Sequence, residues 1–124
     1  MLKIISVFIG GGLGAILRFL ATKLSVRIFS SPVYGTFAVN ILGCFLIGLV
    51  FGFILNKTEN ISDIAKVFVT AGFLGGLTTF STFNFEVFEL LKSGKVSLGL
   101  FYIFASCFAG LICTYFGYLI SSKM

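Results

Sequence analysis

The chain has 124 residues, of which 58% are hydrophobic and only 10% are charged. Soluble domains carry about 25% charged residues, so the composition excludes an ordinary soluble protein and predicts a membrane protein. The formal net charge is +5, but the basic residues lie scattered at the ends of apolar segments and form no run. We therefore expect them to anchor the chain at the bilayer surface and expect no binding of nucleic acid. Three cysteines inside apolar segments and the lack of any His argue against a disulfide framework and a zinc site.

Charged residues divide the chain into four apolar segments, each about long enough to cross the hydrocarbon core of a bilayer. These segments are Ile4–Thr22, Ile28–Asn56, Val67–Phe85 and Val96–Ser122. We predict an all-α membrane protein that forms a single four-helix transmembrane domain over residues 1–124. The expected helices cover residues 4–27, 32–56, 62–91 and 95–121, and both termini lie on the same side.

The first helix carries closely spaced glycines and one charge. Gly10 and Gly14 are four residues apart, a spacing that lets another helix approach closely. Arg18 lies near the C-terminal end of this segment, and two roles for it are consistent with the sequence. It either extends to lipid phosphate or raises the local anion concentration at the mouth of a path.

The second helix has one strongly polar residue, Asn40, near its centre. An amide at this depth is costly unless it bonds to another helix or faces water. Asn40 is therefore either a bond between helices or an N–H donor for a passing anion.

The third helix is predicted to break at residues 75–79, because glycines and hydroxyl residues gather in the middle of its apolar segment. Backbone groups freed at this depth are tolerated only where protein or a water-filled path satisfies them, so the break predicts an ion or substrate site. The alternative is a continuous helix with a glycine packing face, whose hydroxyls bond back to their own helix. The residues concerned are Gly72, Gly75, Gly76, Thr78, Thr79, Ser81 and Thr82.

A break in the helix would expose groups that attract anions and groups that attract cations. Thr78, Thr79 and Ser81 are placed to cap the second half-helix, whose N-terminus favours anions. Carbonyls released around Gly75 and Thr78 suit a hard cation such as sodium.

Aromatic and acidic side chains follow the break. Phe80 and Phe83 share a face of the second half-helix, and the positive edge of an aromatic ring can meet a small anion without trapping it. Glu86 lies one residue past the apolar run. We expect it to pair with a basic residue or to cap the structure.

The fourth helix carries a polar stripe with a four-residue period: Tyr102, Ser106, Gly110 and Thr114. Hydroxyls at this spacing either bond back to the carbonyl four residues earlier or line a narrow polar path. Because Asn40 and the break lie at a similar depth, we favour the path.

Orientation in the membrane is not decided by the basic residues. Those on the side of the termini are Lys3, Lys57, Lys66 and Lys123; those on the other side are Arg18, Lys23, Arg27, Lys92 and Lys95. A difference of one fixes no orientation. We therefore predict that the chain inserts both ways and forms an antiparallel homodimer, which would supply in two chains the inverted repeat that larger transporters carry in one. A single orientation set by other factors is the alternative.

Two other functional classes fit the sequence less well. Catalysis has no support, since no nucleophile is placed beside a base. A proton-coupled exporter needs a carboxylate at mid-membrane, and no acidic residue lies at the centre of a segment. A structural subunit that packs its glycine faces into a larger complex stays possible.

The stretch Gly75-Gly76-Leu77-Thr78-Thr79-Phe80-Ser81-Thr82-Phe83 resembles the signature of the small fluoride channels known as the Fluc or CrcB family. Further matches are Gly11-Gly12-Leu13-Gly14-Ala15 with Arg18, and Gly35-Thr36 with Val39-Asn40-x-x-Gly43. The resemblance implies a passive fluoride exporter of microbial plasma membranes, which lowers fluoride toxicity. It also implies a dual-topology antiparallel dimer with two pores and a central structural sodium.

The resemblance also implies roles for individual residues. Phe80 and Phe83 would line the pore, Asn40 would be the pore amide, and Arg18 would lie at a vestibule. Gly75 and Thr78 would donate sodium-binding carbonyls from both subunits. A polar track would be formed by Thr79, Ser81, Tyr102, Ser106 and Thr114. One departure is Gly110, where relatives tend to carry a serine.

Overall fold

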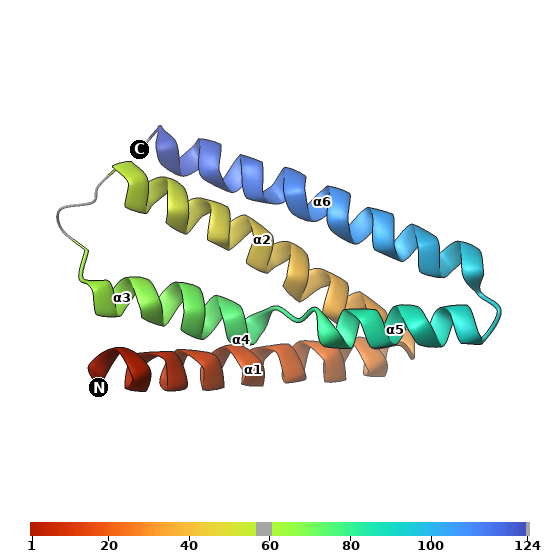
Figure 1. Ribbon diagram of the computed structural model, residues 1–124. Helices are drawn as coiled ribbons and strands as arrows, with labels where there is room; N and C mark the ends of the chain where they lie inside the picture. Colours follow the sequence, from red (N-terminus) through yellow and green to blue (C-terminus); the bar gives the residue numbers. More distant parts are fainter. Residues whose placement is uncertain (57–60, 124) are drawn as a thin grey trace.

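The computed structural model describes residues 1–56 and 61–123, and in these ranges four helical spans are long and apolar enough to cross a membrane. Helices α1 (Leu2–Phe29), α2 (Val33–Asn56) and α6 (Val96–Ser122) are continuous. The third span consists of α3 (Asp63–Val67), η1 (Phe68–Leu74), α4 (Gly75–Leu77) and α5 (Ser81–Lys92) (Figure 1). The predicted all-α fold of four crossings, with a broken third helix, is confirmed. Lys57, one of the residues counted for orientation, lies outside the described residues.

The break lies slightly later in the chain than the sequence suggested. Gly75 and Gly76 are still helical, and the backbone leaves the helix at Thr78, which is extended with φ −83° and ψ 156°. Gly76 lies so close to α1 that a Cβ there would overlap the carbonyl oxygen of Gly11. Gly75 is exposed, and a Cβ there would meet only the Thr70 carbonyl oxygen, at 3.7 Å. Gly76 therefore serves helix packing, and the hydroxyl residues after the two glycines form the break.

The segment before the break is a π-helix, η1, which we did not predict. A π-helix has hydrogen bonds between residues five apart; it is rare and is frequently found at functional sites. Thr70 in η1 donates its hydroxyl to the Lys66 carbonyl at 2.8 Å, so one polar side chain in this half is satisfied by its own helix.

Helix α1 packs closely along η1 and α4. A Cβ on Gly14 would overlap the Phe73 carbonyl oxygen, and one on Gly10 would lie 2.6 Å from the Phe68 carbonyl oxygen. The prediction that Gly10 and Gly14 let another helix approach is confirmed. Helix α2 pairs in the same way with α6, where a Cβ on Gly48 would overlap the Thr114 carbonyl oxygen.

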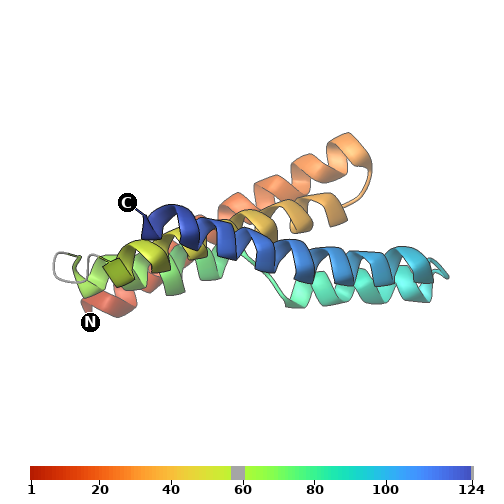
Figure 2. The same ribbon diagram turned by 90° about the horizontal axis from the view of Figure 1, so that it is seen from above.

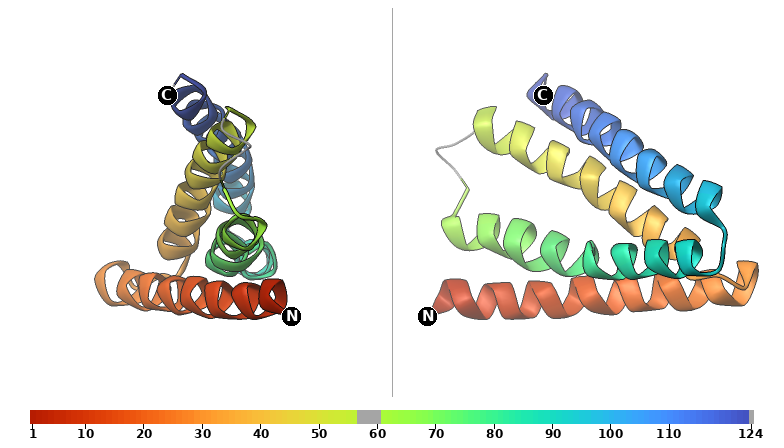
Figure 3. Two further views of the ribbon diagram at one scale, coloured as in Figure 1. Left: turned by 90° about the vertical axis from the view of Figure 1, so that its left-hand side faces the viewer. Right: turned by 45° about the vertical axis from the view of Figure 1, so that its right-hand side comes forward.

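The two halves of the broken helix have different neighbours. The first half lies along α1, whereas α5 packs on α6 and α2 and makes no contact with α1 in the described residues. Figure 2 shows α1 and α5 diverging beyond the break, and Figure 3 shows the first half and α1 running side by side. A small buried core lies on each side of the break: Val39, Leu74 and Leu77 form one, and Phe83, Val87 and Tyr102 form the other.

Candidate functional site

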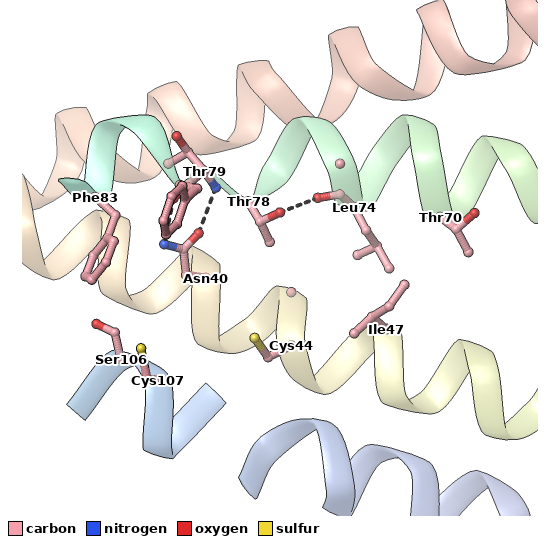
Figure 4. A pocket seen from close by; sticks show the side chains of 13 residues that line it. Asn40, Cys44, Ile47, Thr70, Leu74, Thr78, Thr79, Phe83, Ser106 and Cys107 are labelled. Carbon is pink, nitrogen blue, oxygen red and sulfur yellow. Dashed lines mark hydrogen bonds between the residues drawn. The ribbon is translucent and has the colours of Figure 1, made fainter. Parts of the chain in front are cut away.

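A groove of about 430 Å³ lies beside the break, between α2, the third span and α6. Several of the predicted site residues line it, as Figure 4 shows: Asn40, Thr78, Thr79, Phe83 and Ser106. Gly75 and Phe80 line it as well. Residues from three separate crossings thus meet at mid-membrane.

The Asn40 amide holds the broken backbone from the side. Its Nδ2 donates to the Thr79 carbonyl at 3.0 Å, and its Oδ1 accepts from the Thr79 N–H at 2.8 Å. Both backbone groups of one break residue are therefore satisfied by a side chain of α2. Because Nδ2 carries two N–H groups and this is its one acceptor among the described residues, a second N–H stays available.

The carbonyls at the end of the first half-helix are satisfied unevenly. The Leu74 carbonyl accepts from both the N–H and the hydroxyl of Thr78, at 3.0 and 2.9 Å. The Gly76 carbonyl accepts from Arg18 Nε at 3.1 Å. Among the hydrogen bonds of the described residues, none reaches the carbonyl oxygen of Gly75 or of Thr78. The Leu77 carbonyl likewise accepts none of these bonds, but of the three residues only Gly75 and Thr78 line the groove.

Only one of the three predicted caps of the second half-helix is seen. The Thr79 hydroxyl accepts from the Thr82 N–H at 3.2 Å, as expected for a residue that caps α5. For Thr78 the capping prediction was wrong, because its hydroxyl donates backward to Leu74 and closes the first half instead. Ser81 is the first residue of α5 and is exposed.

The two phenylalanines after the break have different surroundings. Their ring centroids are 6.2 Å apart, so the expected shared face holds. However, Phe83 is buried at 8% exposure, and Phe80 is 78% exposed in the single chain. Phe83 also presents an edge contact to Tyr102, with 4.9 Å between centroids and 70° between ring planes.

The polar stripe of α6 divides into residues with different partners. Ser106 lines the groove, and its Oγ is buried without a hydrogen-bond partner in the described residues. The Thr114 hydroxyl donates to the Gly110 carbonyl at 3.0 Å, as in the alternative of back-bonding. Gly110 is buried, and a Cβ there would lie 3.1 Å from Cys44 Sγ. Within the stripe, Ser106 is thus the residue that lines the groove and whose hydroxyl has no partner among the described residues.

A buried carboxylate near the groove was not anticipated. Glu86 is 6% exposed; its Oε1 accepts from the Thr36 hydroxyl at 2.6 Å and its Oε2 from the Tyr102 hydroxyl at 2.8 Å. The expectation of a basic partner or a cap was wrong, because these two hydroxyls, from α2 and α6, occupy both carboxylate oxygens. Hydrogen bonds to a charged group are stronger than neutral ones, so Glu86 ties α5 to two other helices. The one feature of the sequence that could have indicated this buried carboxylate was the position of Glu86, just past the apolar run.

The geometry defines a class of protein. A broken helix, a pocket lined by an amide, a hydroxyl and ring edges, and few charges together suit the passage of a small ion rather than bond-making chemistry. At mid-membrane, such irregular backbone is typical of channels and transporters.

Comparison with known proteins identifies the family. Residues 5–118 match the family model described as CrcB-like protein, Camphor Resistance (CrcB). The chain is 40% identical over 125 residues to the fluoride-specific ion channel FluC of Flavobacterium psychrophilum, covering all of both chains. It is 42% identical over 120 residues to the protein of that name from Azobacteroides pseudotrichonymphae, covering 96% of this chain and 95% of the relative. It is also 37% identical over 123 residues to the one from Aquifex aeolicus, covering 98% of each. The chain belongs to the CrcB-like family and is a multi-pass protein of the cell membrane.

Proposed function

We propose that this protein is a fluoride-selective ion channel that lets fluoride leave the cell passively and thereby lowers cytoplasmic fluoride. The curated relatives carry that name over essentially their full length. A channel needs no catalytic group, so the role that we propose is that of an ion conductor and not of an enzyme.

The observation that carries the proposal is the buried Ser106 hydroxyl, which faces the groove without a partner. A buried polar group without a partner is costly, and a fluoride ion in the groove would accept its hydrogen bond. The free N–H of Asn40 offers a second donor. Phe83 and Phe80 add ring edges, which are positive and attract a small anion weakly. Weak interactions at several points allow an ion to enter and to leave.

The remaining assignments follow from position. Thr79 and Ser81 begin the second half-helix, whose N-terminus favours an anion. Tyr102 and Thr114 donate their hydroxyls elsewhere in this chain and are not among the residues that line the groove, so we assign them no contact with the ion. Ser106, Asn40, Phe80 and Phe83 are the residues that we assign to the ion itself.

The functional unit is an antiparallel homodimer. Gly75, Phe80 and Ser81 are exposed at the break in the single chain, and irregular backbone facing lipid is not tolerated at this depth. A second copy that covers the break would also line the groove, giving two antiparallel pores per dimer. The near-equal basic residues on the two sides support insertion in both orientations.

A sodium ion is the cofactor that the break suits. The Gly75 and Thr78 carbonyls are free, and carbonyl oxygens are the donors that hard cations prefer. Two oxygens from one chain leave such a cation under-coordinated, so a second copy would complete the site at the dimer interface. The ion would neutralise the negative ends of the released carbonyls and hold the two chains together.

Fluoride efflux from liposomes that contain only the purified protein tests the proposal. We expect rapid fluoride release at a fluoride electrode, with no chloride release in a parallel experiment. No fluoride release from folded protein would contradict the proposal and favour the structural-subunit alternative. Equal release of both anions would contradict the proposed selectivity for fluoride.

Reporter fusions at the C-terminus test the dimer separately. A chain that inserts both ways shows reporter activity on both sides of the membrane. Activity on one side only would contradict the antiparallel arrangement.

A further inference from the structure

The Arg18 side chain ends at the break rather than in open space. Its Nε donates to the Gly76 carbonyl at 3.1 Å, and Arg18 is only partly exposed. Gly76 lies in the last turn of the first half-helix, and its carbonyl would normally accept from the N–H of Phe80. Because the helix ends at Leu77, the Phe80 N–H does not reach the Gly76 carbonyl. Arg18 supplies the missing donor.

Arg18 is held in place by the packing before it. One helical turn earlier, Gly14 lies so close to the broken helix that a Cβ would overlap the Phe73 carbonyl oxygen and would lie 2.6 Å from the Leu77 N. The glycine contact thus fixes the distance between α1 and α4. At that distance a side chain of four bonds from Cα to Nε reaches the Gly76 carbonyl.

Two side chains therefore secure the break from opposite sides. Arg18 of α1 binds the last turn of the first half, and Asn40 of α2 binds both backbone groups of Thr79. Only two residues separate Gly76 from Thr79. A guanidinium also interacts favourably with the negative end of the helix dipole, which lies here.

We propose that Arg18 is a positioning residue: its Nε–H fixes the end of the first half-helix, and so fixes where the free carbonyls and Phe80 lie. This rests on the proposed fluoride conduction, which supplies the readout. The proposal assigns the effect of Arg18 to one hydrogen-bond donor. Attraction of anions by its charge is the rival explanation.

Two substitutions separate donor from charge. In Arg18→Gln, Nε2 stands the same number of bonds from Cα as Arg Nε, so the donor is kept and the charge is lost. In Arg18→Lys the charge is kept, but the atom in the place of Nε is a methylene group and donates nothing. Arg18→Met has neither donor nor charge and is the matched control.

We expect Arg18→Gln to keep flux per folded protein within about threefold of the natural chain, and Arg18→Lys and Arg18→Met to lose about tenfold or more, in line with the value of a charge-assisted hydrogen bond. Normalising to folded protein removes a loss that is only structural. The proposal would be overturned if Arg18→Lys kept the fluoride flux while Arg18→Gln lost it. It would also be overturned if Arg18→Gln, Arg18→Lys and Arg18→Met all gave the same flux.

Ionic strength provides a second measurement that does not need the Lys variant to fold. Attraction by an exposed charge weakens as salt rises, whereas a local hydrogen bond does not. We expect the natural chain and Arg18→Gln to respond alike to salt between about 0.01 and 1 M. A steep salt dependence in the natural chain that Arg18→Gln lacks would overturn the proposal. Absence of fluoride flux in the natural chain would instead contradict the proposed function.

Discussion

Replacing Asn40 with Leu removes both hydrogen bonds that hold the break from the side of α2. Leu has a similar size but can neither accept from the Thr79 N–H nor donate to the Thr79 carbonyl. A backbone group left unpaired away from water costs about 1–3 kcal/mol. Two such groups therefore lower the free energy of unfolding by about 2–6 kcal/mol.

Asn84→Leu is the matched control. Asn84 lies just beyond the same break and donates Nδ2 to the Phe80 carbonyl, also at 3.0 Å, but it is exposed. Losing one exposed hydrogen bond costs about 0.5–1.5 kcal/mol. Asn40→Leu should therefore be the less stable variant by about 0.5 kcal/mol or more.

The assay is unfolding by sodium dodecyl sulfate in detergent micelles, followed by circular dichroism. The comparison uses the midpoint and slope of each transition. Equal free energies of unfolding for the two variants would show that the Asn40 amide does not support the break, and would refute the reasoning.

Three further predictions use other contacts. Phe80→Ile should reduce fluoride flux while the dimer stays assembled, because Ile lacks a positive ring edge. Phe101→Ile, at an exposed position outside the groove, should leave the flux unchanged. Equal flux in liposomes for the two variants would show that the Phe80 ring takes no part in conduction. Asn40→Asp should suppress flux, since it places an oxygen against the Thr79 carbonyl and a negative charge in the path; undiminished efflux would make Asn40 only a bond between helices. Gly14→Ala should lower the thermal unfolding midpoint in detergent, because its Cβ overlaps the backbone of η1, whereas Gly12→Ala, which meets nothing within 4 Å, should stabilise α1 by about 0.5–1 kcal/mol. Lower stability of the Gly12 variant than of the Gly14 variant would contradict the packing described for α1.

The sequence was informative where a local pattern decides the structure. Four apolar segments predict four crossings, and the glycines and hydroxyl residues around Thr78 and Thr79 favour a break over a continuous helix. The break was placed too early because Gly75 and Gly76 were interpreted as helix breakers, although both are helical and Gly76 packs closely on α1. Local propensity cannot reveal a neighbour that lies 60 residues earlier in the chain.

The site was harder to predict, because its hydrogen bonds join different helices. Thr36, Glu86 and Tyr102 meet only through the rotation of α2, α5 and α6 about their axes, which no single segment determines. The four-residue period of α6 similarly placed Ser106 and Thr114 on one face. It could not distinguish the hydroxyl that is left unpaired from the one that bonds back to its own helix.

The π-helix η1 lets the third span hold one residue more than a regular α-helix would hold over the same turns. Its hydrogen bonds join residues five apart instead of four, so the extra residue is taken up inside η1 without turning the helix faces on either side of it. Deleting one residue between Val67 and Leu74 would therefore let the segment become a regular α-helix and would leave Gly76 on the face that meets α1. The same deletion in a regular α-helix, such as α1 between Gly10 and Gly14, would turn one side by about 100° relative to the other and would separate the two glycine contacts. A lost residue is thus tolerated inside η1 and not in the regular helix that packs against it.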